Sequence, residues 1–207
     1  FFAATDSFEI AVEGVGGHAA KPQETVDPVL AASHVVLALQ SVVSRNADPV
    51  SQVVLSVTAV ESASKAFNVI PPRVTLRGTV RTLDAEDRDM AERRLKAVAE
   101  ATASAYGARA EVRYARGYPV MSNHPRETEH AREVARAVAG ACEEAPLVMG
   151  GEDFAYMLEA RPGAYILLGN GDTAMVHHPA YDFNDEAIPA GCSWLAGMAE
   201  ARLPLRG

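Results

Sequence analysis

Cysteine and positive charge are scarce in this sequence, and both shortages limit what the protein can be. Its 207 residues include two cysteines, Cys142 and Cys192. One disulfide is possible, but nothing indicates a disulfide framework, and two lone thiols favour a reducing compartment. The formal net charge is -8, from 27 acidic and 19 basic residues. No nucleic-acid partner is expected, because phosphates are neutralised by clustered Lys and Arg and no such cluster occurs.

Long apolar segments are also missing. The opening FFAATDSFEI has neither the charged region nor the apolar stretch of a signal peptide. No apolar run approaches the roughly 20 residues that a bilayer-spanning helix needs. We therefore expect a cytoplasmic protein without a membrane partner. Hydrophobic residues make up 48% of the chain, which is enough for a sizeable core.

Two periodicities alternate through residues 1–115 and predict a ferredoxin-like fold. Apolar residues spaced by three and four predict a helix over about 26–46, with Asp27 before Pro28 at its start. LDAED opens a second helix over about 84–106, with Asp84 as its cap. Alternating apolar and polar residues, or β-branched runs, predict strands over 7–13, 52–60, 74–82 and 109–115. The resulting order β-α-β-β-α-β is that of a four-stranded antiparallel sheet with both helices on one face.

Residues 116–207 are predicted to be an incomplete α/β segment. Glycine and prolines over 117–125 interrupt the earlier pattern and indicate a linker. A helix over 127–139, a short helix after MGGEDF, one buried strand AYILLG and a final helix over 185–201 follow. Because one buried strand cannot form a stable sheet alone, we expect this segment to need partner strands from elsewhere.

Two loop regions contain candidate polar residues. His18 lies in the glycine-rich GGHAAKP, where an imidazole can donate to a developing oxyanion or simply occupy the surface. Asn68, in AFNVIPP, and Arg81, at a strand end, can together hold a substrate carboxylate. The alternative is a loop-capping asparagine and a solvated arginine. The alternation places Arg77 and Arg81 on the face opposite the core.

Two carboxylates follow the paired glycines of MGGEDFAYM. Glu152 and Asp153 open the expected short helix there. They either cap the start of this helix, where carboxylates are favoured, or form part of a pocket wall.

Adjacent histidines occur in MVHHPAYDFND. In an extended segment His177 and His178 point to opposite sides, so at most one reaches a given metal ion and the other supports it or packs near Pro179. The polar residues that follow are better explained as a cap for the last helix: Asp182, Asn184 and Asp185. The sequence contains no serine-hydrolase elbow, P-loop, CxxC pair or HExxH.

Several stretches, in order along the chain, resemble a known family. FEIAVEGVGGHAAKPQETVDPV, AFNVIP, LRGTVRT, MGGEDFAYML, PGAYILLGNGD and HHPAYDFNDEAI are similar to amidohydrolases of the aminoacylase and hippurate hydrolase type, which belong to a wider metallopeptidase family. Its members have a catalytic α/β domain with two metal ions and an inserted ferredoxin-like domain that dimerises. The resemblance implies that residues 1–115 are the dimerisation and lid domain, and residues 116–207 the C-terminal half of the catalytic domain.

The resemblance also assigns roles to individual residues. His177 matches the last metal ligand, and His178 beside it is not expected to bind metal. His18 matches a lid histidine that reaches the partner subunit's site and stabilises the tetrahedral intermediate. Asn68 and Arg81 match lid residues that bind the substrate carboxylate, and Glu152 lies in a stretch that matches a wall of the substrate pocket.

The implied activity is hydrolysis of N-acyl amino acids, such as hippurate, by a homodimer with two divalent metal ions per site (zinc, manganese, cobalt or nickel). In the family, most ligands and the general base come from an N-terminal half with a Cys-Gly-His-type motif and a Glu-Glu pair. Neither motif is found in a matching context here. We therefore expect the chain alone to be inactive. The alternative is an inactive fragment that serves only as a dimerisation or small-molecule-binding module.

Overall fold

The chain divides into two compact units. The structure is a computed structural model that describes residues 2–203. Unit 1 is Phe1–Met121 with Leu147–Ala155, and unit 2 is Ser122–Pro146 with Tyr156–Gly207. The segment that carries the glycine pair therefore belongs to unit 1, although unit 2 contains the residues on both sides of it.

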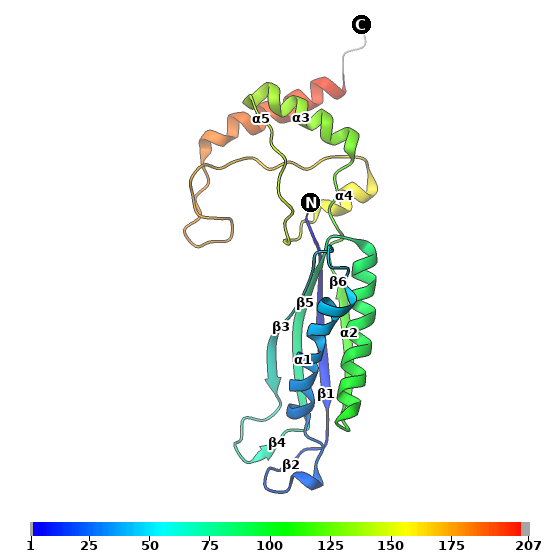
Figure 1. The fold of residues 1–207 in the computed structure, drawn as a ribbon. Coiled ribbons are helices and arrows are strands. Elements are labelled where there is room, and N and C mark those ends of the chain that lie inside the picture. The colour runs from blue at the N-terminus through cyan, green and yellow to red at the C-terminus, as the bar shows by residue number, and fades with distance from the viewer. Residues whose placement is uncertain (1, 204–207) are drawn as a thin grey trace. The chain divides into compact units, whose positions relative to one another are not determined.

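Unit 1 is built on a four-stranded antiparallel sheet in the order β3-β5-β1-β6 (Figure 1). Its strands are β1 (Ala4–Glu13), β3 (Val53–Ser62), β5 (Arg73–Thr82) and β6 (Arg109–Arg116). A second, two-stranded sheet pairs β2 (Gly17–His18) with β4 (Val69–Ile70), and a 3-10 helix, η1 (Pro22–Glu24), follows β2. The expected mixed α/β fold with an antiparallel sheet is confirmed.

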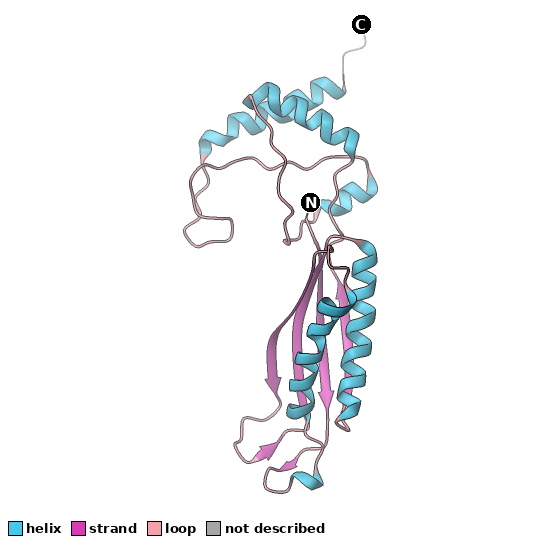
Figure 2. Cartoon of the chain, in the orientation of Figure 1, coloured by secondary structure: helices cyan, strands magenta, loops and turns pink. Residues whose placement is uncertain are grey.

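Two long helices, α1 (Pro28–Asn46) and α2 (Ala85–Ala105), lie along one face of this sheet (Figure 2). Each begins at an aspartate, as the sequence predicts. Asp27 accepts a hydrogen bond from an amide in the first turn of α1 at 2.8 Å, and Asp84 does the same in α2 at 2.7 Å. These caps satisfy amides that have no partner inside a helix.

The core lies between the helices and the sheet. Side chains spaced by three and four on α1 and α2 meet the alternating inward residues of β1 and β5. Among those fully buried there are Val35, Leu39, Leu95, Ile10 and Leu76. The residues at odd positions of β5 point to the opposite, open face, as predicted for Arg77 and Arg81.

One expectation about apolar runs was wrong. Within residues 2–203, α1 is a helix long and apolar enough to cross a membrane by length and composition alone. Its buried side chains pack on the sheet, and they include Val35 and Leu39. The requirements of the core account for the apolar inner face of this helix.

A buried ion pair joins the start of β1 to α2. Arg88 donates from Nε and Nη2 to the carboxylate of Asp6, at 3.0 and 2.6 Å. The Tyr114 hydroxyl and the Gly117 amide also donate to this carboxylate, at 2.8 and 3.1 Å. Burial by itself raises the pKa of Asp6, but the hydrogen bonds from Arg88 and Tyr114 outweigh it and hold the pKa below its usual value.

Three backbone segments run together where β1 begins, and we call them the base of unit 1: residues 2–5, 117–121 and 147–151. Isolated bridges join the first segment to the second in antiparallel fashion and to the third in parallel fashion. The Ala3 amide donates to two carbonyls of the third segment, those of Val148 at 3.0 Å and Gly150 at 2.9 Å. The base therefore ties a late part of the sequence to the first strand.

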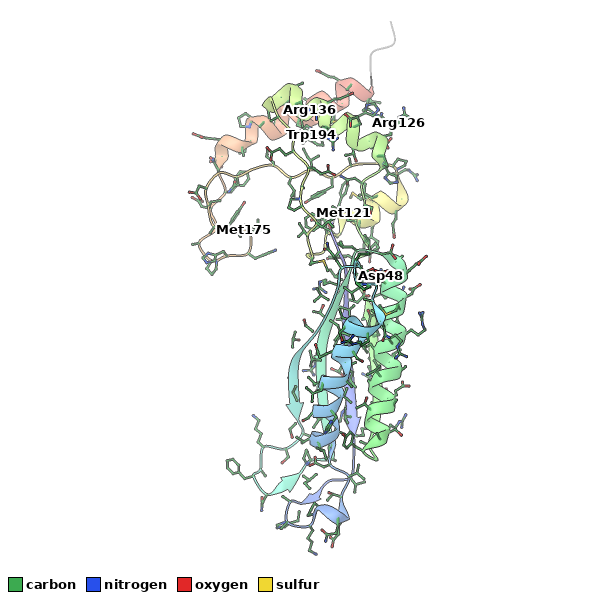
Figure 3. All side chains as sticks on the ribbon, viewed as in Figure 1. Asp48, Met121, Arg126, Arg136, Met175 and Trp194 are labelled. Atoms are coloured by element: carbon green, nitrogen blue, oxygen red, sulfur yellow. The ribbon has the colours of Figure 1, made fainter. Side chains whose placement is uncertain are left out.

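Unit 2 is mainly helical. Its helices are α3 (Pro125–Ala139), most of α4 (Phe154–Ala160), the 3-10 helix η2 (Asp185–Ala187) and α5 (Ile188–Arg202). Trp194 of α5 donates from its indole nitrogen to the carbonyl of Ala131 on α3 at 3.1 Å, and Figure 3 shows this side chain beside α3. Asn184 caps η2 by accepting from the Glu186 amide at 3.0 Å, whereas α5 itself begins after Ala187 without a side-chain cap. The expected cap therefore belongs to the 3-10 helix that leads into the last helix.

The expected strand AYILLG does not form. Among the described residues of unit 2 no strand is present, and Leu167 and Leu168 are 53% and 50% exposed. A strand needs a neighbour for its backbone groups, and the described part of unit 2 offers none. Instead the side chain of Asn123 bonds the amide and the carbonyl of Tyr165, each at 2.8 Å. An amide side chain thus takes the place of a neighbouring strand.

Replacing Asp6 by Asn should destabilise unit 1 and remove an acid-dependent part of its stability. The folded pKa of Asp6 is lowered, so its contribution is present above the unfolded pKa of about 3.9 and is lost as the pH falls through the folded value. The variant also leaves Arg88 buried without its counter-charge, at a cost of roughly 3–5 kcal/mol. Urea unfolding at a series of pH values measures both effects.

Asp89→Asn is the control for this experiment. Asp89 pairs with Arg116 at 2.6 Å, but its side chain is 58% exposed. Exposed pairs contribute at most about 1 kcal/mol, so this variant should unfold almost as the parent does. Identical pH profiles for the parent and Asp6→Asn would contradict our account of the buried pair.

Candidate functional site

One group of candidate residues lies where β2 pairs with β4, and we call it the tip cluster: His18 and Asn68. His18 is the register partner of Val69, and the Ala19 amide donates to the Asn68 carbonyl at 3.0 Å. Both candidate side chains are exposed. A Cβ on Gly16 would lie 2.9 Å from the carbonyl oxygen of Ile70 in β4. The close approach of the segments that carry β2 and β4 therefore requires glycine at this position.

The His18 ring has one nitrogen occupied by its own loop. The Ala20 amide donates to Nδ1 of His18 at 3.1 Å. Because Nδ1 accepts a hydrogen bond, the neutral ring carries its proton on Nε2. His18 therefore presents an N–H donor away from its backbone, which is the form that an oxyanion requires.

Arg81 lies on the open face of the sheet with half of its guanidinium engaged. Its Nη1 donates to the carbonyls of Asp6 at 3.3 Å and Val80 at 3.1 Å, and to the hydroxyl of Thr79. Within residues 2–203, Nε and Nη2 of Arg81 have no hydrogen-bond partner. The protein thus fixes the guanidinium through Nη1 and leaves the edge formed by Nε and Nη2, which can bind a carboxylate.

The glycine loop before α4 lies close to β1, the strand that pairs with the strand of Arg81. Thr5 is the register partner of Arg81. Gly151 is so close to Thr5 that a Cβ on the glycine would lie 2.0 Å from the threonine Cγ2. Glu152 follows directly and accepts from the Phe154 amide at 3.3 Å, which fits the expected cap of α4. Arg81, Thr5, Gly151 and Glu152 form what we call the base cluster.

The tip and base clusters are at opposite ends of the sheet. Arg81 is near the last residue of β5, whereas Asn68 precedes the first, and Figure 1 shows β2 and β4 beyond that far end. The strand from Arg73 to Arg81 alone spans roughly 26 Å at the usual rise per residue. The expected pairing of Asn68 with Arg81 around one carboxylate is therefore not made within a single copy.

The paired histidines of unit 2 lie in a turn, not in the extended segment that was expected. His177 has φ 68°, the left-handed region, and is the only non-glycine residue with positive φ among those described. This conformation costs roughly 1–2 kcal/mol, and such strain is concentrated at functional sites. The loop carrying Met175 extends away from α3 and α5 in Figure 3.

His178 has a ring nitrogen in use, and His177 does not. The Ala180 amide donates to Nδ1 of His178 at 3.1 Å. No hydrogen bond of the His177 ring occurs among the described residues. Nowhere in residues 2–203 do three His, Cys, Asp or Glu side chains converge as a metal site would require. His177 is thus available as a ligand, but the described residues do not complete a metal centre.

Some residues of the two clusters could be recognised in the sequence, and one could not. The glycine-rich loop and the paired glycines drew attention to His18 and Glu152. Thr5 was missed, since a threonine near the start of a strand has no distinguishing pattern. Its close contact to Gly151 and its pairing with Arg81 identify it, and both exist only in three dimensions.

The chain is similar to known proteins over nearly its whole length. The model of peptidase family M20/M25/M40 matches residues 9–201. N-acetylcysteine deacetylase from Bacillus subtilis (strain 168) is 37% identical over 197 residues, which cover 95% of this chain and 52% of that protein. Hippurate hydrolase from Campylobacter jejuni is 36% identical over 201 residues, with coverage of 95% and 52%. This chain thus spans about half the length of these curated relatives.

A solved structure is similar over the same extent. The YXEP protein of Bacillus subtilis, described as a dinuclear metal binding peptidase from the M20 family, superposes with a TM-score of 0.81 at 31% identity. The match covers 98% of this chain and 51% of that one.

The tautomer of His18 is directly measurable. We expect neutral His18 to carry its proton on Nε2, because the Ala20 amide donates to Nδ1. Nitrogen-15 chemical shifts of the ring, recorded above the pH at which the ring is charged, distinguish the two tautomers. His178, with the same contact from Ala180, should give the same pattern and serves as an internal reference. A proton on Nδ1 of His18 would rule out the contact.

Proposed function

The chain belongs to peptidase family M20/M25/M40, and from this we propose that the protein containing it hydrolyses the amide bond of N-acyl amino acids. The names of its relatives support this reaction. They include N-acetylcysteine deacetylase, hippurate hydrolase and N-acetyldiaminopimelate deacetylase. Each name describes an amino acid that carries an acyl group on its amine, or the removal of that group.

The observation that carries the proposal is the free edge of Arg81. Every N-acyl amino acid has a charged α-carboxylate, and a guanidinium with Nε and Nη2 available binds such a group through two parallel hydrogen bonds. Nη1 of Arg81 is held by backbone carbonyls, so the fork is fixed before the substrate binds. In this role Glu152, which follows Gly151 in the base cluster, contributes to the wall around the substrate.

His18 supplies the second element of the proposed reaction. Water attack on the amide carbonyl places negative charge on its oxygen, and an Nε2–H donor stabilises that charge. The His18 of one copy cannot reach the substrate held by its own Arg81, given the length of β5. We therefore assign His18 and Asn68 to the active site of a second copy, where Asn68 joins the partner's Arg81 at the carboxylate.

This assignment requires a homodimer, and the two edges of the sheet differ in a way that favours one. The β6 edge is protected by alternating charges, Arg109, Glu111 and Arg113. The β3 edge carries a single charged residue, Glu61. Sheet edges that lack charge invite pairing with another chain. Next to β3, α1 exposes Leu30 and Leu37, which are 50% and 69% exposed. We propose that the β3 edge and these leucines form the dimer face.

The metal centre belongs to the same proposal. His177 would be one ligand of a site for two divalent ions such as zinc, manganese, cobalt or nickel, and the remaining ligands would come from protein outside residues 1–207. When bound, the ions supply Lewis acidity and an activated water. This chain contributes the carboxylate grip of Arg81 and the oxyanion donor of His18. A protein that only dimerises or binds small molecules is the alternative, favoured by the lack of three converging ligands among the described residues.

Arg81→Lys should weaken substrate binding in the full-length, metal-loaded protein. Loss of a paired, charge-assisted contact costs about 1.5–3 kcal/mol, or roughly 10- to 100-fold in KM. The control is Arg77→Lys on the same strand and face, because Arg77 is engaged by Glu9 at 2.9 Å and Glu61 at 2.8 Å. Steady-state kinetics with N-acetyl and N-benzoyl amino acids measures the difference.

Equal kinetics for the two variants would contradict the role of Arg81. Residues 1–207 alone should show no metal-dependent turnover of these substrates. Turnover by that fragment would show that no further ligands are needed. Failure of the full-length protein to hydrolyse any N-acyl amino acid would favour the alternative.

Leu37→Lys should shift the protein from dimer to monomer. The substitution places a charge on the proposed dimer face, where the two copies would bring their lysines together. Val50→Lys is the control, since Val50 is 89% exposed but lies in the connection between α1 and β3. Light scattering during size-exclusion chromatography gives the mass. A monomeric parent protein at high concentration would contradict the dimer.

A further inference from the structure

Thr5 is enclosed by two glycines at the base of unit 1. A Cβ on Gly117 would lie 2.3 Å from the Thr5 carbonyl oxygen, and one on Gly151 would lie 2.0 Å from its Cγ2. Real Cβ atoms do not approach other heavy atoms this closely, so both neighbours must be glycine while Thr5 stays in place. Gly150 differs, because a Cβ there would meet Val148 at 3.5 Å, an ordinary contact.

Hydrogen bonds hold Thr5 in place from both sides. Its amide donates to the Tyr118 carbonyl at 3.0 Å, and its Oγ1 accepts from the Tyr118 amide at 3.1 Å. The Gly117 amide donates to the Thr5 carbonyl at 2.8 Å. The side chain therefore has a fixed rotamer, which directs Cγ2 toward Gly151.

The loop that Thr5 contacts belongs with the sheet, although its neighbours in sequence do not. Leu147–Ala155 groups with unit 1, whereas the residues before and after it group with unit 2. The Ala3 amide donates to the loop carbonyls of Val148 and Gly150. Thr5 is also the register partner of Arg81 in β5. Thr5 thus contacts Gly151 of the glycine loop and also pairs with Arg81 in the sheet.

We propose that Thr5 is a positioning residue, which fixes the loop of Gly151 and Glu152 beside Arg81 so that these groups form one rigid part of the substrate site. Any motion between the two units then moves Glu152 together with Arg81 and the sheet. The catalytic meaning of this contact rests on the proposed function. The contact itself does not, and it can be tested without turnover.

The test is a double-mutant cycle in the full-length protein, with Gly151→Ala, Thr5→Ser and the two combined. Gly151→Ala forces its new methyl group against Cγ2 of Thr5, and an ordinary carbon contact of about 3.5 Å requires a shift of roughly 1.5 Å. Thr5→Ser removes Cγ2 and keeps Oγ1. The atoms that remain near the new methyl group, Cβ and Oγ1, lie at 3.3 Å from it, a tight contact that a shift of a few tenths of an ångström relieves.

The first readout is independent of activity. Gly151→Ala alone should lower the melting temperature and speed exchange of the Ala3 amide hydrogen, and the combined variant should restore both. Gly150→Ala, the neighbouring control, should change neither. If Gly151→Ala and Gly150→Ala behave alike, or if Thr5→Ser does not rescue Gly151→Ala, the proposed contact is overturned.

The second readout is steady-state kinetics with N-acyl amino acids. A displacement of about 1 Å in a positioned group costs on the order of 100-fold in rate, so Gly151→Ala should lose activity on that scale and the combined variant should regain it. Restored melting temperature and amide exchange without restored kinetics would overturn the positioning role. A parent protein without hydrolase activity would overturn the proposed function, while the first readout would still decide the contact.

Discussion

The buried carboxylate of Asp6 is the point on which the geometry of unit 1 depends. A charge removed from water must be paired, and Asp6 receives donors from α2, from β6 and from the segment that leaves the sheet. It therefore fixes three elements relative to β1 at once. The residue before it is Thr5, so the same interaction sets the position of the threonine against Arg81 and the glycine loop. The ion pair thus supports the base cluster, together with the hydrogen bonds that Thr5 and Ala3 make themselves.

The helices and main strands of unit 1 were predictable because their signals are local. Apolar spacing and capping aspartates placed α1 and α2 within about two residues, since both features act within a few turns of the chain. The prediction of a strand at AYILLG was wrong because its signal is not local. Its apolar composition indicates burial against other strands, and whether such neighbours exist is not a property of the segment itself. The strands β2 and β4 have two residues each and are too short to show an alternation of apolar and polar residues.

The candidate site was predictable in its members and not in its arrangement. His18, Asn68, Arg81 and Glu152 were recognised by residue type and by their resemblance to a family. Their grouping into a tip cluster and a base cluster depends on the length and direction of β5, which places Asn68 and Arg81 far apart although only 13 positions separate them in sequence. The left-handed turn at His177 was also unexpected, because nothing in the paired histidines distinguishes a turn from the extended segment that was assumed.

The length of the sheet has a further meaning for how such a protein would behave in a cell. Arg81 and His18, the residues proposed to bind the carboxylate and the oxyanion, lie at opposite ends of one copy, so the proposed active site would exist only while two copies are associated. Specific activity would then be a function of protein concentration, falling on dilution below the dissociation constant of the dimer. The expression level would then determine which fraction of the chains is active, as well as how many chains are present.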